Sequence, residues 1–142
     1  MPNKKYRVLL AEDDKFISMA LSESLSRAGF EVVAAYDGEE ALSKIKIVKP
    51  DIILLDLIMP KKDGFDVLEE LNREETREAM NGQNNESIPI IVFTNLDQDQ
   101  DMKKAIDLGA REYLIKANIS MEEVIKKIRK YLGIADEGEM KK

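Results

Sequence analysis

Cysteine and histidine are both absent from this sequence of 142 residues. Without cysteine there is no disulfide framework, no thiolate nucleophile and no cysteine-based zinc site. Without histidine the chain lacks the imidazole that can act as a catalytic base, bind a metal or carry a phosphoryl group. Any chemistry must therefore use carboxylates, lysine, hydroxyl groups or a bound ion.

Long hydrophobic runs are also missing. No apolar run approaches the ~20 residues of a membrane span, and no apolar stretch follows the lysines near the start, as it would in a signal peptide. The formal net charge of −6 argues against nonspecific binding of nucleic acid by the whole surface. We expect a cytoplasmic protein with no membrane partner and no direct nucleic-acid partner.

Length and pattern predict one α/β domain covering residues 1–142, with a core at about 5–133 and a flexible tail at 134–142. Short apolar runs alternate with amphipathic stretches of helical spacing, which is typical of a parallel sheet with helices on both faces. A three-layer, flavodoxin-like (βα)5 fold with strand order 2-1-3-4-5 is the arrangement we favour. The five strands are predicted near residues 6–11, 31–35, 51–55, 88–93 and 112–115.

Helix ends carry their own local patterns. Gly109 predicts the end of the fourth helix, and Ser120 with Glu123 predicts a capping box at the start of the fifth. The segment 72–88 is polar, and we expect the third helix to run into it and a mobile loop to follow from about Asn81. This segment lies away from the strand ends, so we assign it no catalytic role.

Carboxylates follow two of the predicted strands. Glu12 and Asp13 come after the first strand and Asp56 after the third, and these strands are neighbours in the favoured order. Two unit charges ~4 Å apart repel by about 4 kcal/mol at an effective dielectric of 20, so such a cluster holds a proton or binds a cation. An open site of carboxylate oxygens suits Mg2+. Asp14 is better explained as a helix N-cap.

Polar groups also follow the last two strands. Thr94 comes after the fourth apolar run and Lys116 after the fifth, which brings a hydroxyl and an ammonium to the same edge of the sheet. Either residue alone is commonplace at a strand end. Together with the acidic cluster they are the partners that a bound phosphoryl group requires: a cation, a positive side chain and a hydroxyl donor.

The order and spacing of these residues resemble the receiver domain of the response regulator family, the chemotaxis-regulator-like domain of two-component signalling. The resemblance covers about residues 5–133, and the combination is far more specific than any single motif. The matching residues are Glu12-Asp13, Asp56, Met59-Pro60, Asp63-Gly64, Thr94, Gly109-Ala110, Tyr113 and Lys116.

The resemblance implies a phosphorylation site that uses Mg2+. Asp56 would accept a phosphoryl group from a phosphohistidine on a sensor histidine kinase or a phosphotransfer protein. Asp13 and Asp56 would bind Mg2+ together with the backbone carbonyl of Ile58, and Glu12 would act through a metal-bound water. The absence of histidine fits the receiving side of such a transfer.

The resemblance also implies a conformational switch. Lys116 would pair with the phosphoryl oxygens, Thr94 would move toward them, and Tyr113 would turn inward, which shifts the population between two conformers. A core aromatic residue with its hydroxyl at the surface is an equally good interpretation of Tyr113.

The output of the switch is not visible in the sequence. No DNA-binding or catalytic pattern follows Gly133, so we expect either a receiver that acts alone or a piece of a longer chain, with an unknown downstream effector protein. Basic residues in the last part of the chain are interpreted mainly as solvated helix faces, with a surface for partner docking as the alternative. They are Lys103, Lys104, Arg111, Lys126, Lys127, Arg129 and Lys130.

Four features depart from the family pattern. Ala117 stands where proline usually follows the lysine, and because a cis bond before a non-proline costs about 2.5–4 kcal/mol we predict a trans bond or an altered loop there. Asn95 replaces a small residue and would narrow access to the aspartate or bind the phosphoryl group. Ile58 and Leu96 would hinder an attacking water and make the phosphoryl group long-lived. The 72–88 segment is longer than usual.

Other functions compete with the receiver. A Mg2+-dependent phosphohydrolase of the haloacid-dehalogenase type would use an aspartate nucleophile, but it needs a second aspartate where Ile58 stands. An unphosphorylated interaction module would not need the complete set of polar residues. A flavin phosphate would be repelled by the acidic loop at residues 12–14, and no glycine-rich cradle is present. We therefore expect a signalling receiver and not an enzyme, apart from self-phosphorylation and self-dephosphorylation at Asp56.

Overall fold

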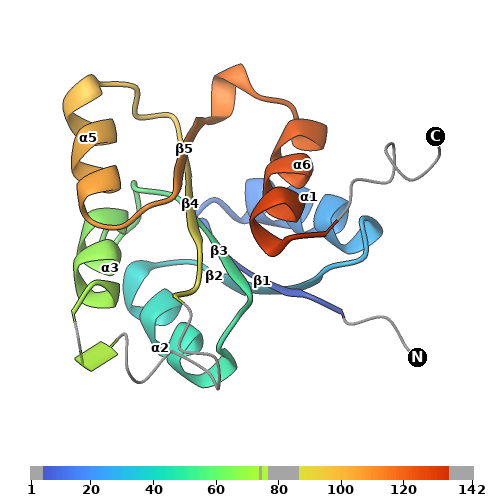
Figure 1. Ribbon diagram of the computed structural model, residues 1–142, viewed down its shortest axis with the longest axis horizontal. Helices are drawn as coiled ribbons and strands as arrows, with labels where there is room; N and C mark the ends of the chain where they lie inside the picture. The colour runs from blue at the N-terminus through green and yellow to red at the C-terminus, as the bar shows by residue number, and fades with distance from the viewer. Residues whose placement is uncertain (1–4, 74, 77–86, 135–142) are drawn as a thin grey trace.

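The computed structural model describes residues 5–73, 75–76 and 87–134 (Figure 1). Strands and helices alternate along the chain, as the sequence pattern predicts. The strands are β1 (Arg7–Ala11), β2 (Glu31–Ala35), β3 (Ile52–Leu55), β4 (Ile90–Thr94) and β5 (Glu112–Ile115). The helices are α1 (Lys15–Arg27), α2 (Gly38–Val48), α3 (Gly64–Leu71), α5 (Asp99–Asp107) and α6 (Met121–Leu132), and a single 3-10 turn, η1 (Lys116–Asn118), follows β5.

The sheet has the predicted flavodoxin-like order, β2-β1-β3-β4-β5, and each pair of neighbours is parallel. Ala11 at the end of β1 lies opposite Leu55 at the end of β3. On the other side, Thr94 at the end of β4 lies opposite Ile115 at the end of β5. The residues that come next in all four strands therefore leave the sheet at the same edge.

Helices cover both faces of the sheet: α1 and α6 lie on one face, and α2, α3 and α5 lie on the other (Figure 1). Along β1, Leu9 packs into the core on the α2 and α3 side and Leu10 into the core on the α1 and α6 side, and neither has exposed area. A parallel sheet buried on both faces needs apolar residues at every position. This double burial explains why the central strands read as continuous apolar runs.

Capping side chains fix where helices begin. Asp14 accepts hydrogen bonds from the backbone N–H groups of Phe16 and Ile17, so it is the N-cap of α1 as predicted. Ser120 and Glu123 form the predicted capping box of α6. Each cap supplies an acceptor for N–H groups that the first helical turn leaves without a partner.

The third helix is shorter than predicted. α3 ends at Leu71 and Asn72 is its C-cap, so the expected continuation into the polar segment is wrong at its first positions. The side chains after Leu71 offer little apolar surface to pack against the sheet, and packing supplies most helical stability. The loop expected from about Asn81 and the tail residues 135–142 lie outside the described residues.

α5 buries little of its apolar surface. Ala105 is buried, whereas Ile106 remains 46% exposed. α5 lies against β5, which is an edge strand, so it has a narrower surface to cover.

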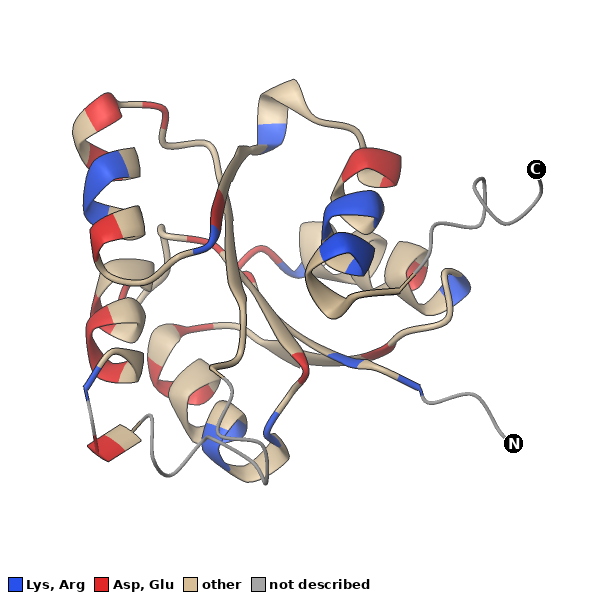
Figure 2. Ribbon diagram, in the orientation of Figure 1, with Lys and Arg blue, Asp and Glu red and all other residues tan. Residues whose placement is uncertain are grey.

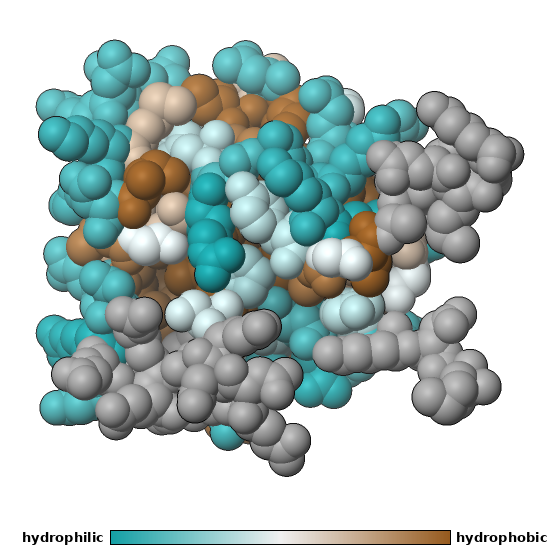
Figure 3. Space-filling model, in the orientation of Figure 1, coloured by the Kyte–Doolittle hydropathy of each residue, from teal (hydrophilic) through white to brown (hydrophobic). Residues whose placement is uncertain are grey.

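Figure 3 shows hydrophilic residues over much of this view of the molecule, with hydrophobic residues between them. No helix within the described parts of the chain combines the length and the apolar character that crossing a membrane would require.

Candidate functional site

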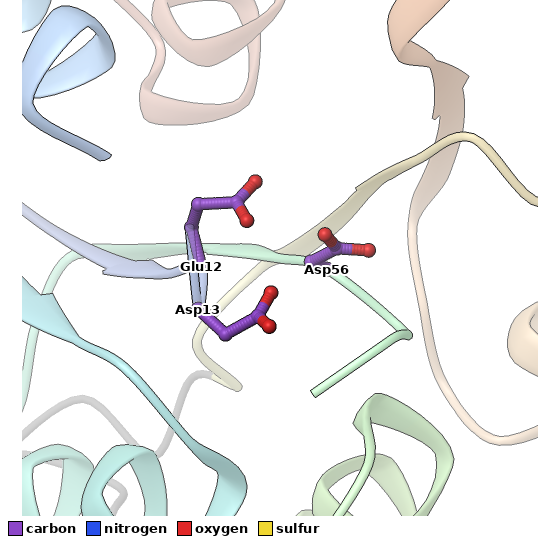
Figure 4. Close-up of side chains that lie close together, drawn as sticks. All are labelled: Glu12, Asp13 and Asp56. Atoms are coloured by element: carbon purple, nitrogen blue, oxygen red, sulfur yellow. The ribbon is translucent and has the colours of Figure 1, made fainter. Parts of the chain in front are cut away.

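Three acidic side chains meet at the carboxyl edge of the sheet (Figure 4). Glu12 and Asp13 follow β1 and Asp56 follows β3. The N–H of Asp56 donates to the carbonyl of Ala11 at 3.0 Å, which continues the pairing of β1 with β3 one residue past the strands. One carboxylate oxygen from each of the three acids lies within 4.8 Å of the others. The structure thus brings together the acids that the sequence placed at neighbouring strand ends.

Two of these carboxylates are buried. Glu12 is 2% exposed and Asp56 is 6% exposed, whereas Asp13 is exposed. Burying a carboxylate is costly unless a partner compensates its charge. Lys116 is that partner, because its Nζ donates to Oδ2 of Asp56 at 2.7 Å and also to the carboxylate of Glu12. One ammonium therefore balances two buried acids, and negative charge remains in excess.

Burial and their mutual contacts shift the pKa values of Glu12 and Lys116. Burial raises the pKa of the Glu12 carboxyl above its ordinary value, even though the hydrogen bond from Lys116 acts to lower it. The charge of Asp56 adds to the rise. Burial alone would lower the pKa of Lys116, but the hydrogen bonds to Asp56 and Glu12 and the negative charges of these two acids together outweigh burial and raise it. Lys116 is therefore firmly protonated.

Neighbouring backbone groups fix the position of Asp56. Its Oδ1 accepts a hydrogen bond from the N–H of Ile58 at 3.2 Å, while Oδ2 faces Lys116. Behind it, the N–H of Gly64 donates to the carbonyl of Leu57 at 3.0 Å. A Cβ at position 64 would lie only 2.5 Å from the carbonyl oxygen of Asp56. Glycine at this position is what allows α3 to begin so close to the backbone of the acid.

Lys116 reaches Asp56 across the end of β4, since Asp56 follows β3 and Lys116 follows β5. The last residue of β4 is Thr94, which has no exposed area and whose Oγ1 accepts a long hydrogen bond of 3.4 Å from the N–H of Leu96. The aromatic ring of Phe93 lies 5.7 Å from the ammonium of Lys116. The predicted hydroxyl and ammonium thus belong to the same edge of the sheet as the acids.

The acidic cluster has the donor chemistry of a Mg2+ site. Each of Glu12, Asp13 and Asp56 offers a hard carboxylate oxygen, and the exposed Asp13 leaves one side open to the waters that Mg2+ retains. The excess negative charge favours the binding of a cation. The contribution of the Ile58 carbonyl stays a prediction.

Sequence comparison identifies the family to which this site belongs. A family model described as "Response regulator receiver domain" matches residues 8–129. The chain belongs to this family. It is a receiver domain of two-component response regulators, which is a signalling domain.

Relatives of this receiver domain include longer regulators. It is 36% identical over 133 residues to the "Probable transcriptional regulator ycf27" of Porphyridium aerugineum, covering 94% of this chain and 50% of that protein. It is 38% identical over 130 residues to the "DNA-binding dual master transcriptional regulator RpaA" of a Synechocystis strain, covering 92% of this chain and 50% of that protein. The chain thus spans about half the length of these curated relatives.

A solved structure agrees with the fold. The receiver domain of the Francisella response regulator 1452 superposes with a TM-score of 0.78 at 27% identity, and the match covers 91% of this chain and 98% of that one. The predicted five-stranded parallel architecture is therefore confirmed both by the strand order and by the comparison.

Tyr113 of this receiver domain is tied to the loop after β4. Its hydroxyl donates to the carbonyl of Leu96 at 2.8 Å. Burial, followed by the negative charges of Asp101 and Asp56, raises the pKa of Tyr113 to about 12. The hydroxyl is therefore bonded to the loop that begins after Thr94. A movement of Tyr113 with Thr94 stays a prediction.

Sequence reasoning missed a contact between Asn95 and Ala117, two of the residues that depart from the family pattern. Oδ1 of Asn95 accepts a hydrogen bond from the N–H of Ala117 at 3.1 Å. No cis peptide bond occurs in the described segments, so the predicted trans bond before Ala117 is confirmed. The pattern held a clue, because an amide acceptor and a non-proline N–H stand after neighbouring strands.

Basic residues occur on α6 and on α5 (Figure 2). Lys127 forms an ion pair with Glu112 at 2.7 Å, and this hydrogen bond lowers the pKa of the Glu112 carboxyl. The ammonium of Lys104 lies 4.4 Å from the centre of the Phe65 ring. These two lysines therefore have contacts within the domain, and a docking role for the basic residues stays a prediction.

Proposed function

We propose that Asp56 is the phosphoacceptor of this receiver domain. The observation that carries the proposal is the position of its carboxylate, which accepts a hydrogen bond from the ammonium of Lys116 and lies within 4.8 Å of carboxylate oxygens of Glu12 and Asp13. An oxygen of Asp56 would attack the phosphorus of a phosphohistidine on a histidine kinase or a phosphotransfer protein. The phosphorus–nitrogen bond would break, the imidazole would leave with its electron pair, and an acyl phosphate would remain.

The metal proposed for this transfer is Mg2+, held by Asp13 and Asp56 with the carbonyl of Ile58, and by Glu12 through water. The close approach of the three carboxylate oxygens supports this set. When bound, Mg2+ would offset the negative charge of the phosphoryl oxygens. Lys116 would contribute a second positive charge, since its ammonium already bonds to Asp56.

The switch would start from the hydrogen bonds of the unphosphorylated site. Lys116 would move its bond from the Asp56 carboxylate to a phosphoryl oxygen, because the new group carries more negative charge. Thr94 would turn its hydroxyl from the Leu96 N–H, a 3.4 Å contact, toward the same group. The carbonyl of Leu96 also accepts a hydrogen bond from the hydroxyl of Tyr113, so a movement of this loop would move Tyr113 on β5 as well.

The phosphoryl group on Asp56 would be long-lived, because its hydrolysis by water would be slow. The residue two positions after Asp56 is Ile58, whose apolar side chain is 54% exposed at the rim of the site. It offers neither an acid to protonate a leaving group nor a base to activate water, which disfavours a phosphohydrolase. Partly buried Leu96 adds apolar surface. We therefore propose a signalling role without enzymatic turnover of an external substrate, and one receiver domain over residues 1–142.

The output would be a change in affinity for an effector. Relatives named as transcriptional regulators, one of them as DNA-binding, support a DNA-binding effector. The expectation of no direct contact with nucleic acid finds no support in these relatives. We propose that the protein acts in the cytoplasm with a histidine kinase, as the family to which it belongs would require.

Amide NMR spectra test the proposal directly. Beryllofluoride mimics a phosphoryl group on a carboxylate, so adding it with Mg2+ should shift the amides of Thr94, Leu96 and Tyr113. The same titration on Asp56→Asn should leave those amides unchanged, because the acceptor oxygen is gone. Equal shifts in both proteins, or none in either, would contradict the proposal.

A further inference from the structure

A single side chain joins the loops that follow β4 and β5. Oδ1 of Asn95 accepts the N–H of Ala117 at 3.1 Å. The backbone ladder between these strands ends with Thr94 opposite Ile115. The Asn95–Ala117 bond therefore lies just past the last ladder pair and continues the connection between the strands with a side chain in place of a backbone carbonyl.

Both partners of this bond are adjacent to site residues. Asn95 comes directly after Thr94, and Ala117 comes directly after Lys116. The backbone of Lys116 begins η1 beyond the end of β5, and β5 is an edge strand with one neighbour. A bond at position 117 is thus well placed to restrain this segment.

Restraint matters here because Lys116 must keep a specific direction. Its Nζ donates to Asp56 at 2.7 Å and to Glu12 at the same time, from a backbone on the far side of β4. Hydrogen bonds weaken steeply as their angles depart from linearity. A long side chain with many rotamers keeps such a geometry more readily when its backbone is fixed.

The chemistry of the two positions explains why the bond exists in this chain. Proline at position 117 would have no N–H to donate. A small apolar residue at position 95 would have no acceptor. Asn95 and Ala117 both depart from the family pattern, and the hydrogen bond makes the two departures one structural feature.

We propose that Asn95 is a positioning residue of the phosphoryl site, acting through the N–H of Ala117 to hold Lys116 in line with the group carried by Asp56. The inference rests on the proposed phosphoacceptor role of Asp56. The side-chain amide of Asn95 thus binds the backbone of Ala117, next to Lys116, and not the phosphoryl group itself. The loops of Thr94 and Lys116 then move as one unit during the switch.

Replacing the amide tests the inference. In Asn95→Ala, the through-hydrogen-bond coupling between the Ala117 nitrogen and the side-chain carbonyl carbon of residue 95 should disappear. The affinity for beryllofluoride at saturating Mg2+ should fall roughly three- to tenfold, which is the usual range for one hydrogen bond. The affinity for Mg2+ alone should not fall, because the proposed ligands Glu12, Asp13 and Asp56 follow β1 and β3, and a loosened Lys116 would leave their negative charge less compensated.

Two further variants complete the test. Asn95→Asp keeps an acceptor oxygen at the same position, so the coupling to the Ala117 nitrogen should return. Asn118→Ala removes a matched amide from an exposed neighbour and should leave both affinities unchanged.

Three results would overturn the inference while leaving the phosphoacceptor role intact. They are unchanged beryllofluoride affinity in Asn95→Ala, equal losses in Asn95→Ala and Asn118→Ala, and a parallel loss of Mg2+ affinity, which would indicate a general loosening of the site. A failure of the unsubstituted protein to bind beryllofluoride would instead refute the proposed function, and this inference with it.

Discussion

The Nζ of Lys116 lies 2.7 Å from Oδ2 of Asp56 and bonds to Glu12 as well. A single ammonium, 14% exposed, thus serves two carboxylates that are almost wholly buried. This sharing compensates part of the buried negative charge and leaves the rest uncompensated. The same lysine is therefore central to the stability of the domain and to the proposed chemistry.

Lys116→Met should lower the free energy of unfolding by about 3–5 kcal/mol, because removing one partner leaves buried charge without compensation. Mg2+ should recover part of this loss, since a bound cation can replace the missing positive charge. Urea unfolding with Mg2+ and with a chelator measures both effects. The control is Lys127→Met, which removes the more exposed pair with Glu112 and should cost at most about 1 kcal/mol. Equal losses in the two variants would contradict the central role of Lys116.

Gly64→Ala should displace the backbone of Asp56. The added Cβ would lie 2.5 Å from the Asp56 carbonyl oxygen, and relieving such overpacking costs about 1–3 kcal/mol. Beryllofluoride affinity should fall along with the midpoint of urea unfolding. Gly29→Ala is the comparison, because it strains a positive φ of 98° at a position with open space around it. If Gly29→Ala reduced beryllofluoride affinity as much, the effect would not depend on contact with Asp56.

Ionisation of Tyr113 should lower the free energy of unfolding at high pH. Its pKa in the folded protein is about 12, above the value of 10.0 for an ordinary tyrosine, mainly because of burial. Folding therefore favours the protonated phenol. The stabilisation that the protonated Tyr113 contributes to the folded state is complete below pH 10.0 and is lost as the pH rises toward about 12. Urea midpoints across this interval should fall less steeply in Tyr113→Phe than in the unsubstituted protein. Parallel slopes would refute the assignment.

Ile58→Asn should shorten the lifetime of the phosphoryl group. The amide can hydrogen-bond a water beside Asp56, whereas the isoleucine excludes it. The rate of phosphate release after removal of the phosphodonor measures the lifetime. Ile47→Asn is the matched control, because Ile47 is an exposed isoleucine of α2. A rate in Ile58→Asn that stays close to the rate of the control would remove the support for a hydrophobic rim.

Much of the fold could be predicted because its determinants are local and periodic. The strand that ends at Leu55 is apolar at each position, and the strand that ends at Ala11 is apolar from Val8 onward, as burial on both faces requires. Ser120 with Glu123 predicted the start of α6. The end of α3 at Leu71 was predicted wrongly, because the polar residues directly after it include no glycine or proline to mark a helix end and fail only in the apolar surface that they offer for packing.

The site could be predicted as a set of residues but not as a network. Glu12, Asp56 and Lys116 were expected at one edge because parallel strands end together. That Lys116 would bond to both acids depends on how its side chain crosses β4, which no spacing in the sequence records. The bond between Asn95 and Ala117 depends likewise on how the loops after β4 and β5 lie relative to each other, which the residue types alone do not determine.

Locating the modified carboxylate tests the central claim most directly. The protein is incubated with Mg2+ and a small phosphodonor, the acyl phosphate is reduced with borohydride, and the peptides are mapped by mass spectrometry. Reduction converts a phosphorylated aspartate to homoserine. We predict homoserine at position 56 and none after the same treatment of Asp56→Asn. Homoserine at Asp13 or Asp63 instead, or an unmodified Asp56 in the unsubstituted protein, would contradict the account.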